Sequence, residues 1–377
     1  MFGFGKIGSY DYFAHVVRAL ASRFRAAGEE LHTFIADVAP TASIRRRAMS
    51  LAGLIGNTAS DDNGPIHLFG HSTGGLDARL VASPTATLSN TPNQFRWLSR
   101  LSSVTTMSAP HFGTPLASFF ATVSGQRVLY AISALTVTGL SLGAPPLAAA
   151  SAVVMAISRI DHALGIELRM LDRTTNALLK ALEPATGNEV EKYLDAIRRD
   201  QGAVIQLTPE AMDLFIAGVE DRPGVTYQCT CAMAPPPSLA RIARSLPSPW
   251  RALSSILFTT MFGITSRFDE KYPCAAPDTS EETTRTLVRA FNRMPGARAN
   301  DGVVPILSQI WGRVVWAGYG DHLDVIGHFA GTKHAKTSAN TRHVDWMMSG
   351  SNFNEHTFES LMDAVASGML ASRPLSI

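Results

Sequence analysis

A short apolar stretch that runs into a glycine-flanked serine constrains this chain more than any other feature. Residues 65–75 read Pro-Ile-His-Leu-Phe-Gly-His-Ser-Thr-Gly-Gly, and residues 76–82 continue without glycine or proline. The pattern predicts a buried strand, a sharp turn at Ser72 and a helix. Because a serine at such a turn stands exposed on a strained backbone, Gly70 and Gly74 are expected to remove collisions there. The stretch predicts a nucleophile elbow, with an ordinary glycine-requiring turn as the alternative.

A second Gly-x-Ser-x-Gly pattern surrounds Ser141. Pro145 and Pro146 follow it almost at once, and two prolines prevent an ordinary helix start with a packed first turn. The sequence therefore predicts Ser72, and not Ser141, as the nucleophile.

Composition and charge limit the kinds of partner that this chain is expected to bind. The chain has 377 residues, of which 46% are hydrophobic and 17% charged, with a net charge of +2. These values indicate a large core with an apolar accessory region. The tight basic run at residues 45–47 is interpreted as a solvated helix face, so no nucleic-acid partner is predicted. No basic-then-apolar signal peptide opens the sequence, which favours a cytoplasmic location unless the N-terminus is truncated.

Three cysteines, at positions 229, 231 and 274, are the only sulfhydryl groups of the chain. Three are too few for a disulfide framework or a zinc site. A single bridge from Cys274 to either of the other two is left open.

Residues 128–158 contain no charged side chain, and their length passes the threshold for a membrane span. Gly139, Gly143, Pro145 and Pro146 interrupt the middle of the stretch. Two shorter apolar helices joined by a bend are therefore predicted, and a protein anchored to a membrane through this stretch is the alternative.

Strands and helices alternate through most of the chain. Strands are predicted at 31–38, 65–70, 101–107, 224–231 and 312–317, and a closing helix at 358–365. This alternation predicts an α/β fold with a mostly parallel sheet covered on both faces. A large helical insertion is predicted at 116–204, which divides a core made of 1–115 and 205–377. A second, smaller insertion is predicted at 235–298 within the core.

A serine nucleophile needs a base that takes its proton and an acid that orients the base. Asp301 lies in a predicted tight turn before apolar residues, and His322 follows the last predicted strand. Both positions lie where loops leave the carboxyl ends of strands, which is where sites form in open α/β sheets. Asp324 is an alternative acid, although two residues from His322 it is badly placed to reach the ring.

Four motifs together resemble the true lipases and carboxylesterases of bacteria, which belong to the α/β-hydrolase superfamily. They occupy residues 70–75 (Gly-His-Ser-Thr-Gly-Gly), 108–115 (Ser-Ala-Pro-His-Phe-Gly-Thr-Pro), 300–304 (Asn-Asp-Gly-Val-Val) and 321–324 (Asp-His-Leu-Asp). The resemblance covers about 1–120, 205–235 and 295–370 and leaves both insertions unmatched. It implies an α/β-hydrolase fold in which the first insertion forms a helical lid.

The resemblance also implies roles for single residues. Ser72 is the nucleophile, Asp301 the acid and His322 the base, and the backbone N–H of Thr73 is one oxyanion donor. The second donor falls at Phe2 or Met1. Candidate substrate-binding residues are Phe4, His71 and Phe112.

The N-terminal strands that hold the oxyanion loop in this family are apparently lacking here. Either the reading frame is truncated or the protein dispenses with them. Losing one oxyanion donor typically costs about 10²–10³ in kcat. Weak activity is therefore one expectation, unless Phe2 or Gly3 substitutes for the donor.

No cofactor is expected to be required, but the resemblance raises a structural calcium ion as one interpretation of Asp324. In the family an aspartate at this position binds calcium together with a second aspartate ahead of the acid, for which Asp278 is the nearest candidate. His328 stands where the family has a glutamine ligand, whereas calcium prefers oxygen ligands. A surface carboxylate that caps a turn is the alternative.

These expectations combine into a serine hydrolase of carboxylic esters that works through an acyl-enzyme. An apolar lid favours apolar acyl esters or polyesters as substrates, and a lipid interface as a place of action. The alternatives are a non-catalytic or weakly active binding protein on the same fold, and an acyltransferase with the same triad.

Overall fold

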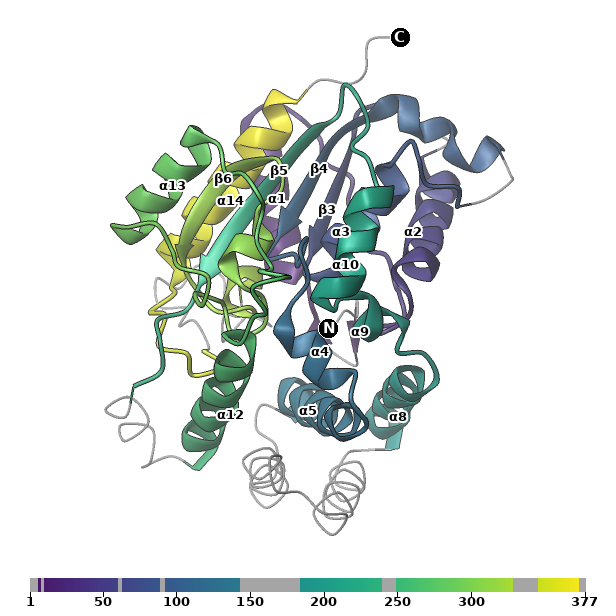
Figure 1. Ribbon diagram of the computed structural model, residues 1–377. Helices are drawn as coiled ribbons and strands as arrows, with labels where there is room; N and C mark the ends of the chain where they lie inside the picture. Colours follow the sequence, from purple (N-terminus) through teal and green to yellow (C-terminus); the bar gives the residue numbers. More distant parts are fainter. Residues whose placement is uncertain are drawn as a thin grey trace.

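A four-stranded parallel sheet organises the computed structural model, which describes residues 6–7, 10–59, 63–88, 92–142, 184–238, 249–327 and 345–372. The strands, in their order across the sheet, are β3 (Ile66–His71), β4 (Leu101–Met107), β5 (Thr226–Met233) and β6 (Arg313–Tyr319) (Figure 1). Neighbouring strands run parallel throughout. Every residue of β4 is buried, as expected for a central strand that is covered on both faces.

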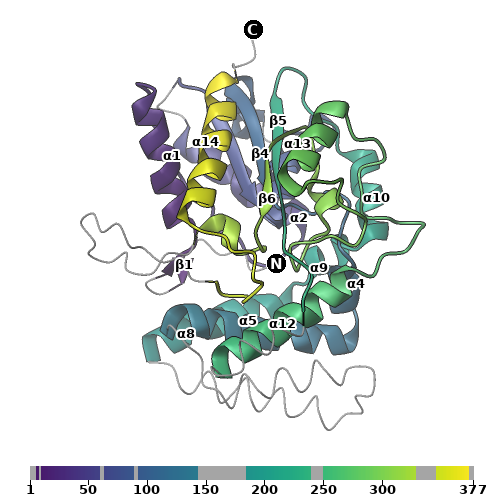
Figure 2. The same cartoon turned by 90° about the vertical axis from the view of Figure 1, so that its left-hand side faces the viewer.

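Helices cover both faces of this sheet. One face carries α1 (Ala14–Ala26) and α14 (Glu355–Ala371), and the other carries α2 (Ile44–Thr58), α3 (Thr73–Ala82) and α13 (Glu281–Phe291) (Figures 1 and 2). The predicted apolar face of the closing helix is buried along α14. Ser43 caps the start of α2, because its side chain accepts a hydrogen bond from the backbone N–H of Arg46.

Several helices lie beyond the carboxyl end of the sheet, where β4 leads into α4. They are α4 (Pro115–Phe120), α5 (Val123–Leu142), α8 (Pro184–Arg199), α9 (Gly202–Gln206) and α12 (Pro249–Thr265). α10 (Pro209–Gly218) lies beside α3 instead (Figure 1), and its Met212 shares a buried cluster with Leu76 of α3. α5, α8 and α12 form a layer across this end of the molecule (Figure 2). Their buried side chains belong to the same hydrophobic cluster as those of α1 and α14, so the described part of this layer shares the main core.

The remaining elements are short. They are the strands β1 (Lys6–Ile7) and β2 (Tyr10–Asp11), which pair as an antiparallel hairpin, and the 3-10 helices η1 (Pro92–Arg100), η3 (Ile306–Gln309) and η4 (Asp324–Ile326). In the described part of the chain, β3 therefore pairs only with β4 and forms an edge of the sheet.

The predicted strand at 31–38 is wrong. These residues form an irregular segment between α1 and α2, and no backbone hydrogen bond joins them to β3 in the described structure. The side chains of Phe34 and Ile35 are exposed, so the apolar residues that suggested a strand are not buried against a neighbour. Strand propensity without a pairing partner does not produce a strand.

The uncharged stretch is described only as far as Leu142, so the predicted bend and second helix lie outside the described residues. α5 continues without a break through Gly139 to Leu142, and Ser141 lies in its helical backbone rather than in a strand-to-helix turn. Residues 143–158 lie outside the described residues. Among the helices that the structure describes, none is both long and apolar enough to cross a membrane.

Two further expectations are corrected by burial. Arg47, predicted on a solvated helix face, is buried and forms an ion pair with Asp77 of α3 at 2.8 Å. The three cysteines are all buried and free, so none of the bridges left open is formed.

Candidate active site

Ser72 stands at the junction of β3 and α3, as the strand–turn–helix pattern predicts. Its backbone has φ 55° and ψ −130°, a region that residues with a Cβ seldom occupy. The Ser72 N–H donates to the carbonyl of Met107 at the end of β4 (2.9 Å), which ties the turn to the neighbouring strand. The side chain is 6% exposed. A strained turn of this kind aims the hydroxyl away from the sheet.

The glycines of the elbow have different functions from those expected. A Cβ placed at Gly70 would lie 2.2 Å from the carbonyl oxygen of Gly74, so Gly70 is sterically required. A Cβ at Gly75 would lie 2.7 Å from the Cβ of Ala109. A Cβ at Gly74 would meet nothing within 4 Å. The close approach of α3 to the strands therefore depends on Gly70 and Gly75, and the expectation for Gly74 is wrong.

The structure brings Ser72, His322 and Asp301 together. The Nε2 atom of His322 lies 2.9 Å from the Oγ atom of Ser72, and its Nδ1 atom lies 2.8 Å from the Oδ2 atom of Asp301. All three side chains are buried. The carboxylate only accepts, so Nδ1 carries the proton and Nε2 is free to accept the serine hydroxyl.

The Asp301 carboxylate is held by its own turn. Its Oδ1 atom accepts hydrogen bonds from the backbone N–H groups of Val303 (2.9 Å) and Val304 (2.7 Å). Its Oδ2 atom also accepts from the side-chain amide of Gln309 at 3.3 Å. These donors orient the carboxylate so that Oδ2 meets the His322 ring.

The alternative acid is placed differently. The Oδ2 atom of Asp324 accepts from the N–H of Asp321 (2.9 Å) and from the Ser351 hydroxyl (2.6 Å). The carboxylate of Asp324 thus bonds to its own loop and to the segment before α14, whereas the acid at hydrogen-bond distance from His322 is Asp301.

The loop at 108–114 supports the Asp301 turn from the other side. The hydroxyl of Ser308 donates to the carbonyl of Gly113 (2.7 Å), and the N–H of Phe112 donates to the same hydroxyl (3.0 Å). The Thr114 hydroxyl donates to the carbonyl of Val303. Sequence reasoning did not find Ser308, because no spacing rule links it to residues 195 and 196 positions earlier. It also missed Gln309, which is 8 positions from Asp301 and lies in no recognised motif.

His111 and Arg79 lie behind this loop. The His111 ring contacts the Thr106 hydroxyl (3.0 Å) and a guanidinium nitrogen of Arg79 (3.2 Å). Burial, and next the charge of Arg79, hold the pKa of His111 well below its ordinary value, so its ring is neutral. Phe112, predicted to bind substrate, packs its ring on the indole of Trp311 at 6.0 Å, which gives it a packing contact in this region.

Of the two predicted oxyanion donors, only Thr73 lies among the described residues. Thr73 is the first residue of α3, where the backbone N–H has no acceptor within the helix. Met1, Phe2, Gly3 and Phe4 lie outside the described residues. His71, predicted to bind substrate, has both ring nitrogens within hydrogen-bond distance of protein groups.

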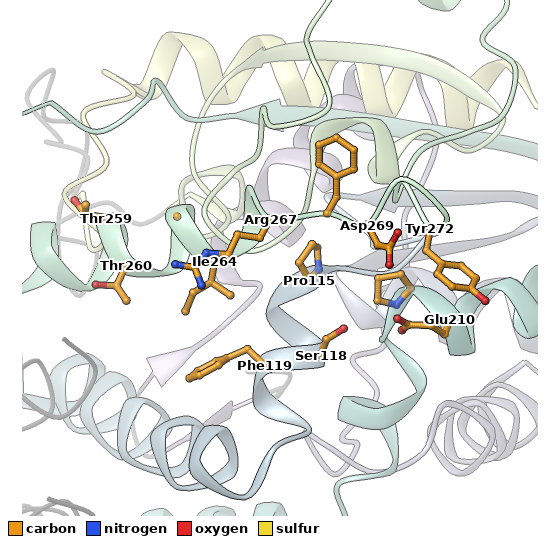
Figure 3. Close-up of a pocket in the computed structure, with 13 residues that line it drawn as sticks. Pro115, Ser118, Phe119, Glu210, Thr259, Thr260, Ile264, Arg267, Asp269 and Tyr272 are labelled. Atoms are coloured by element: carbon orange, nitrogen blue, oxygen red, sulfur yellow. The ribbon is translucent and has the colours of Figure 1, made fainter. Parts of the chain in front are cut away.

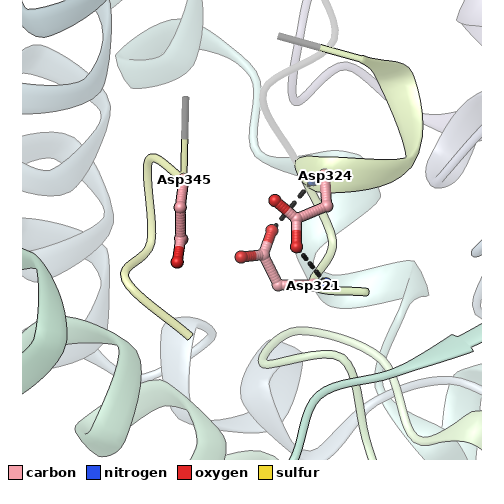
Figure 4. A group of neighbouring side chains, drawn as sticks. All are labelled: Asp321, Asp324 and Asp345. Carbon is pink, nitrogen blue, oxygen red and sulfur yellow. Dashed lines mark hydrogen bonds between the residues drawn. The ribbon is translucent and has the colours of Figure 1, made fainter. Parts of the chain in front are cut away.

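Three aspartates gather beside the His322 loop. Oxygen atoms of Asp321, Asp324 and Asp345 lie within 4.8 Å of one another (Figure 4). Burial, and next the nearby Asp345, raise the pKa of Asp321 to about 7. Burial, and next Asp321, raise the pKa of Asp324 well above its ordinary value, and burial raises that of Asp345. The Oδ2 atom of Asp321 is buried without a hydrogen-bond partner in the described structure.

Crowded carboxylates with an unpartnered buried oxygen suit a hard cation such as calcium, which takes oxygen ligands. The ligand set differs from the expected one. Asp278 is exposed and is not part of this group, whereas Asp345 is. His328 lies outside the described residues.

A cavity of about 580 Å³ opens between α4, α10, α12 and the segment that follows α12 (Figure 3). Its lining includes Pro115, Phe119, Glu210, Ile264 and Arg267, but not Ser72, Asp301 or His322. The cavity is therefore lined by α4, α10, α12 and the segment after α12, and not by the Ser72 hydroxyl or its partners.

Similar solved structures are bacterial lipases and esterases. EstA from Clostridium botulinum is 19% identical, with 95% of this chain and 86% of EstA covered and a TM-score of 0.45. A lipase from Staphylococcus hyicus is 17% identical, with 98% and 94% covered and a TM-score of 0.46. Lipase 1 from Pelosinus fermentans is 17% identical, with 97% and 96% covered and a TM-score of 0.48.

No protein-family model matches the chain, and no curated protein sequence matches it. Because the three TM-scores are below 0.5, the function of this chain is argued from its own site and not from these proteins. A mostly parallel sheet with helices on both faces and a serine elbow at its carboxyl end is the expected α/β-hydrolase fold.

Proposed function

We propose that this chain is a serine hydrolase of carboxylic esters that works through an acyl-enzyme. One observation carries the proposal. Ser72, on a strained strand-to-helix turn, lies 2.9 Å from His322, which in turn lies 2.8 Å from the buried carboxylate of Asp301. Nucleophile, base and orienting acid in this relation are what acyl transfer to a serine requires.

In the proposed reaction, the Oγ atom of Ser72 attacks the ester carbonyl carbon while the Nε2 atom of His322 takes the hydroxyl proton. The N–H of Thr73 donates to the oxygen that becomes negative. The C–O bond to the alcohol then breaks, and His322 returns the proton to the leaving alcohol. Water, activated by His322, next attacks the acyl-enzyme and releases the carboxylic acid and Ser72. Asp301 holds the ring in one tautomer throughout.

The proposed substrates have apolar acyl groups. The helical layer over the carboxyl end of the sheet contributes largely apolar buried residues, among them Leu129 of α5, Leu194 of α8 and Phe258 of α12. Helices with so apolar a core over this end of the sheet favour an aliphatic chain over a charged substrate. This layer is proposed to act as the lid.

A calcium ion, where bound, would be held by Asp321, Asp324 and Asp345 and would supply positive charge to a group of crowded carboxylates. Because Asp321 directly precedes His322 in sequence, these residues help to fix the loop that carries the base. No step of the reaction passes through this site.

The test is turnover of p-nitrophenyl butyrate by the wild type and by Ser72→Ala. We expect the variant to lose a factor of about 10⁴ or more in kcat with an unchanged thermal melt. Ser141→Ala is the matched control, because Ser141 sits in a helix and should be replaceable. A fluorophosphonate should label Ser72 in peptide mass spectra, and labelling of Ser141 instead would contradict the assignment.

A second variant tests the acid. In Asp301→Asn, the amide oxygen should take the place of Oδ1, because two backbone N–H groups point there. The amide nitrogen then faces Nδ1 of His322, which must shift its proton to Nε2 and can no longer accept from Ser72. We expect kcat to fall about 10⁴-fold with little change in KM. If Asp301→Asn kept nearly wild-type kcat, Asp301 would not be the acid, and Asp324 or Asp321 would be tested next.

A further inference from the structure

The side chain that precedes the nucleophile joins the elbow strand to the loop of the base. His71 is the last residue of β3 and is 7% exposed. Its Nε2 atom lies 3.0 Å from the backbone carbonyl oxygen of His322, and its Nδ1 atom lies 3.0 Å from the hydroxyl of Tyr12. The His71 and His322 rings are 4.7 Å apart between centroids. One imidazole therefore bridges β3 and the loop after β6.

The acceptor fixes the tautomer of His71. A carbonyl oxygen only accepts, so Nε2 of His71 must carry the proton. In the neutral ring Nδ1 is then an acceptor, and the Tyr12 O–H donates to it. Tyr12 is itself buried just before α1 and packs edge-on against Phe13 at 5.0 Å. The phenol therefore holds the ring in the tautomer that can donate to the His322 carbonyl.

The backbone of His322 is consequently held on both sides. Its N–H donates to the carbonyl oxygen of Asp301 (3.0 Å), and its carbonyl oxygen accepts from His71. The first bond ties the base to the acid turn, and the second ties it to the strand that carries Ser72. Together they set where the ring stands between its two partners.

We propose that His71 is a positioning residue for the base, with Tyr12 holding its ring from the other side. The proposal rests on the proposed serine-hydrolase function, and it replaces the expected substrate contact of His71. Both nitrogens of the ring bond to protein groups, so the ring acts through the His322 backbone. A shift of about 1 Å between reacting groups can cost about 10² in rate, so the hydrogen bond is expected to affect kcat.

The experiment compares His71→Leu, which removes the donor, with His71→Gln, whose amide nitrogen reaches about the same place as Nε2. We expect kcat to fall about 10²-fold in His71→Leu and to recover to within about 10-fold of wild type in His71→Gln. KM should stay nearly unchanged in both. Tyr12→Phe should lie between them, because the ring keeps its bond to the His322 carbonyl but loses the partner of Nδ1.

Two p-nitrophenyl esters, with short and long acyl chains, separate positioning from substrate contact. A positioning residue lowers kcat by the same factor for both esters, whereas a contact residue changes KM or the preference between them. His67→Gln is the matched control on the same strand, because His67 bonds to Ser103 and not to the base loop. It should keep wild-type kcat.

A measurement independent of turnover completes the test. The Hδ1 proton of His322, shared with Asp301, should give a downfield NMR signal in wild type and in His71→Gln. It should be shifted or lost by exchange in His71→Leu. An unchanged kcat and signal in His71→Leu, or a His71→Gln variant as impaired as His71→Leu, would overturn the proposal. A wild type without esterase activity but with this pattern of signals would reject the proposed function and keep the positioning role.

Discussion

At the scale of single residues, Ser72 occupies a backbone conformation that a side chain with a Cβ rarely adopts. Such strain costs about 1–3 kcal/mol and persists only where the surroundings impose it. Here the surroundings are the bond from Ser72 to Met107 and the close packing of α3 on the strand. That packing in turn needs a residue without a side chain at Gly70.

Gly70→Ala and Gly74→Ala should therefore behave oppositely, although both glycines belong to the same motif. At Gly70 the new methyl group would meet the backbone of Gly74 at 2.2 Å, which we expect to cost about 3 kcal/mol or more and to abolish activity. Gly74→Ala adds a methyl group in open space within a helix and should leave stability unchanged or raise it by up to about 1 kcal/mol. Urea unfolding of both variants checks this. Equal losses in the two would contradict the packing described here.

The three residues proposed for catalysis could be predicted because each sits in a local sequence pattern. Ser72 and His322 follow strands as expected, whereas Asp301 does not, because its turn lies between α13 and η3. The residues that hold these three side chains and their loops in place could not be predicted. Tyr12 is 59 residues from His71, and Ser308 is 195 residues from Gly113. Such contacts depend on how distant segments meet in space, and neither periodicity nor spacing along the chain encodes that.

At the scale of elements, local propensity was reliable where a partner exists and failed where it does not. The buried strands β3 to β6 were all anticipated from their apolar runs, and each has a neighbour in the sheet. Residues 31–38 have a similar composition but no pairing partner. α5 likewise continues through Gly139. The packing of its buried face outweighs the loss of helix stability that one glycine causes, about 1 kcal/mol.

Within β3, the ring of His67 makes the stability of the protein depend on pH. Burial beside Phe24 lowers its pKa to about 4 from the ordinary 6.5. Between pH 4 and 6.5 the unfolded chain therefore binds more protons here than the folded one, so the free energy of unfolding rises with pH in this window. His67→Gln should remove this contribution, about 2 kcal/mol between pH 4.5 and pH 7.

Urea unfolding of the wild type and of His67→Gln across this pH range gives the difference directly, because other groups titrate equally in both. The difference between the two free energies of unfolding should change by about 2 kcal/mol between pH 4.5 and pH 6.5 and stay constant above that. Parallel curves from pH 4.5 upward would show that His67 titrates normally.

At the scale of the whole molecule, the aspartate group links segments that are far apart in the chain. Asp321 and Asp324 belong to the loop after β6, whereas Asp345 belongs to the segment that leads to α14 (Figure 4). The sequence analysis offered Asp278 as the partner of Asp324, whereas the aspartates beside Asp324 in the described structure are Asp321 and Asp345. The twenty residues between Asp324 and Asp345 carry no spacing signal, so only the folded chain shows that the two meet.

Millimolar calcium should accordingly raise the melting temperature of the wild type by several degrees, since binding at about 100 times Kd contributes about 2.7 kcal/mol. Asp345→Asn should abolish the increase, and Asp278→Asn should retain it. Thermal melts in calcium and in EGTA measure both. An increase that depends on Asp278 and not on Asp345 would restore the originally expected pair.

The places of Ser72 and His322 in the sheet have a kinetic consequence. Ser72 follows β3 and His322 follows β6, which are the outer strands of the sheet in the described part of the chain. Their side chains meet across 250 positions of sequence. The entropy of closing so long a loop must be met before the contact contributes anything, so contacts of this kind form slowly. Recovery of ester turnover after denaturation should therefore trail the recovery of helical signal, and the onset of activity would mark the moment at which the last strand docks.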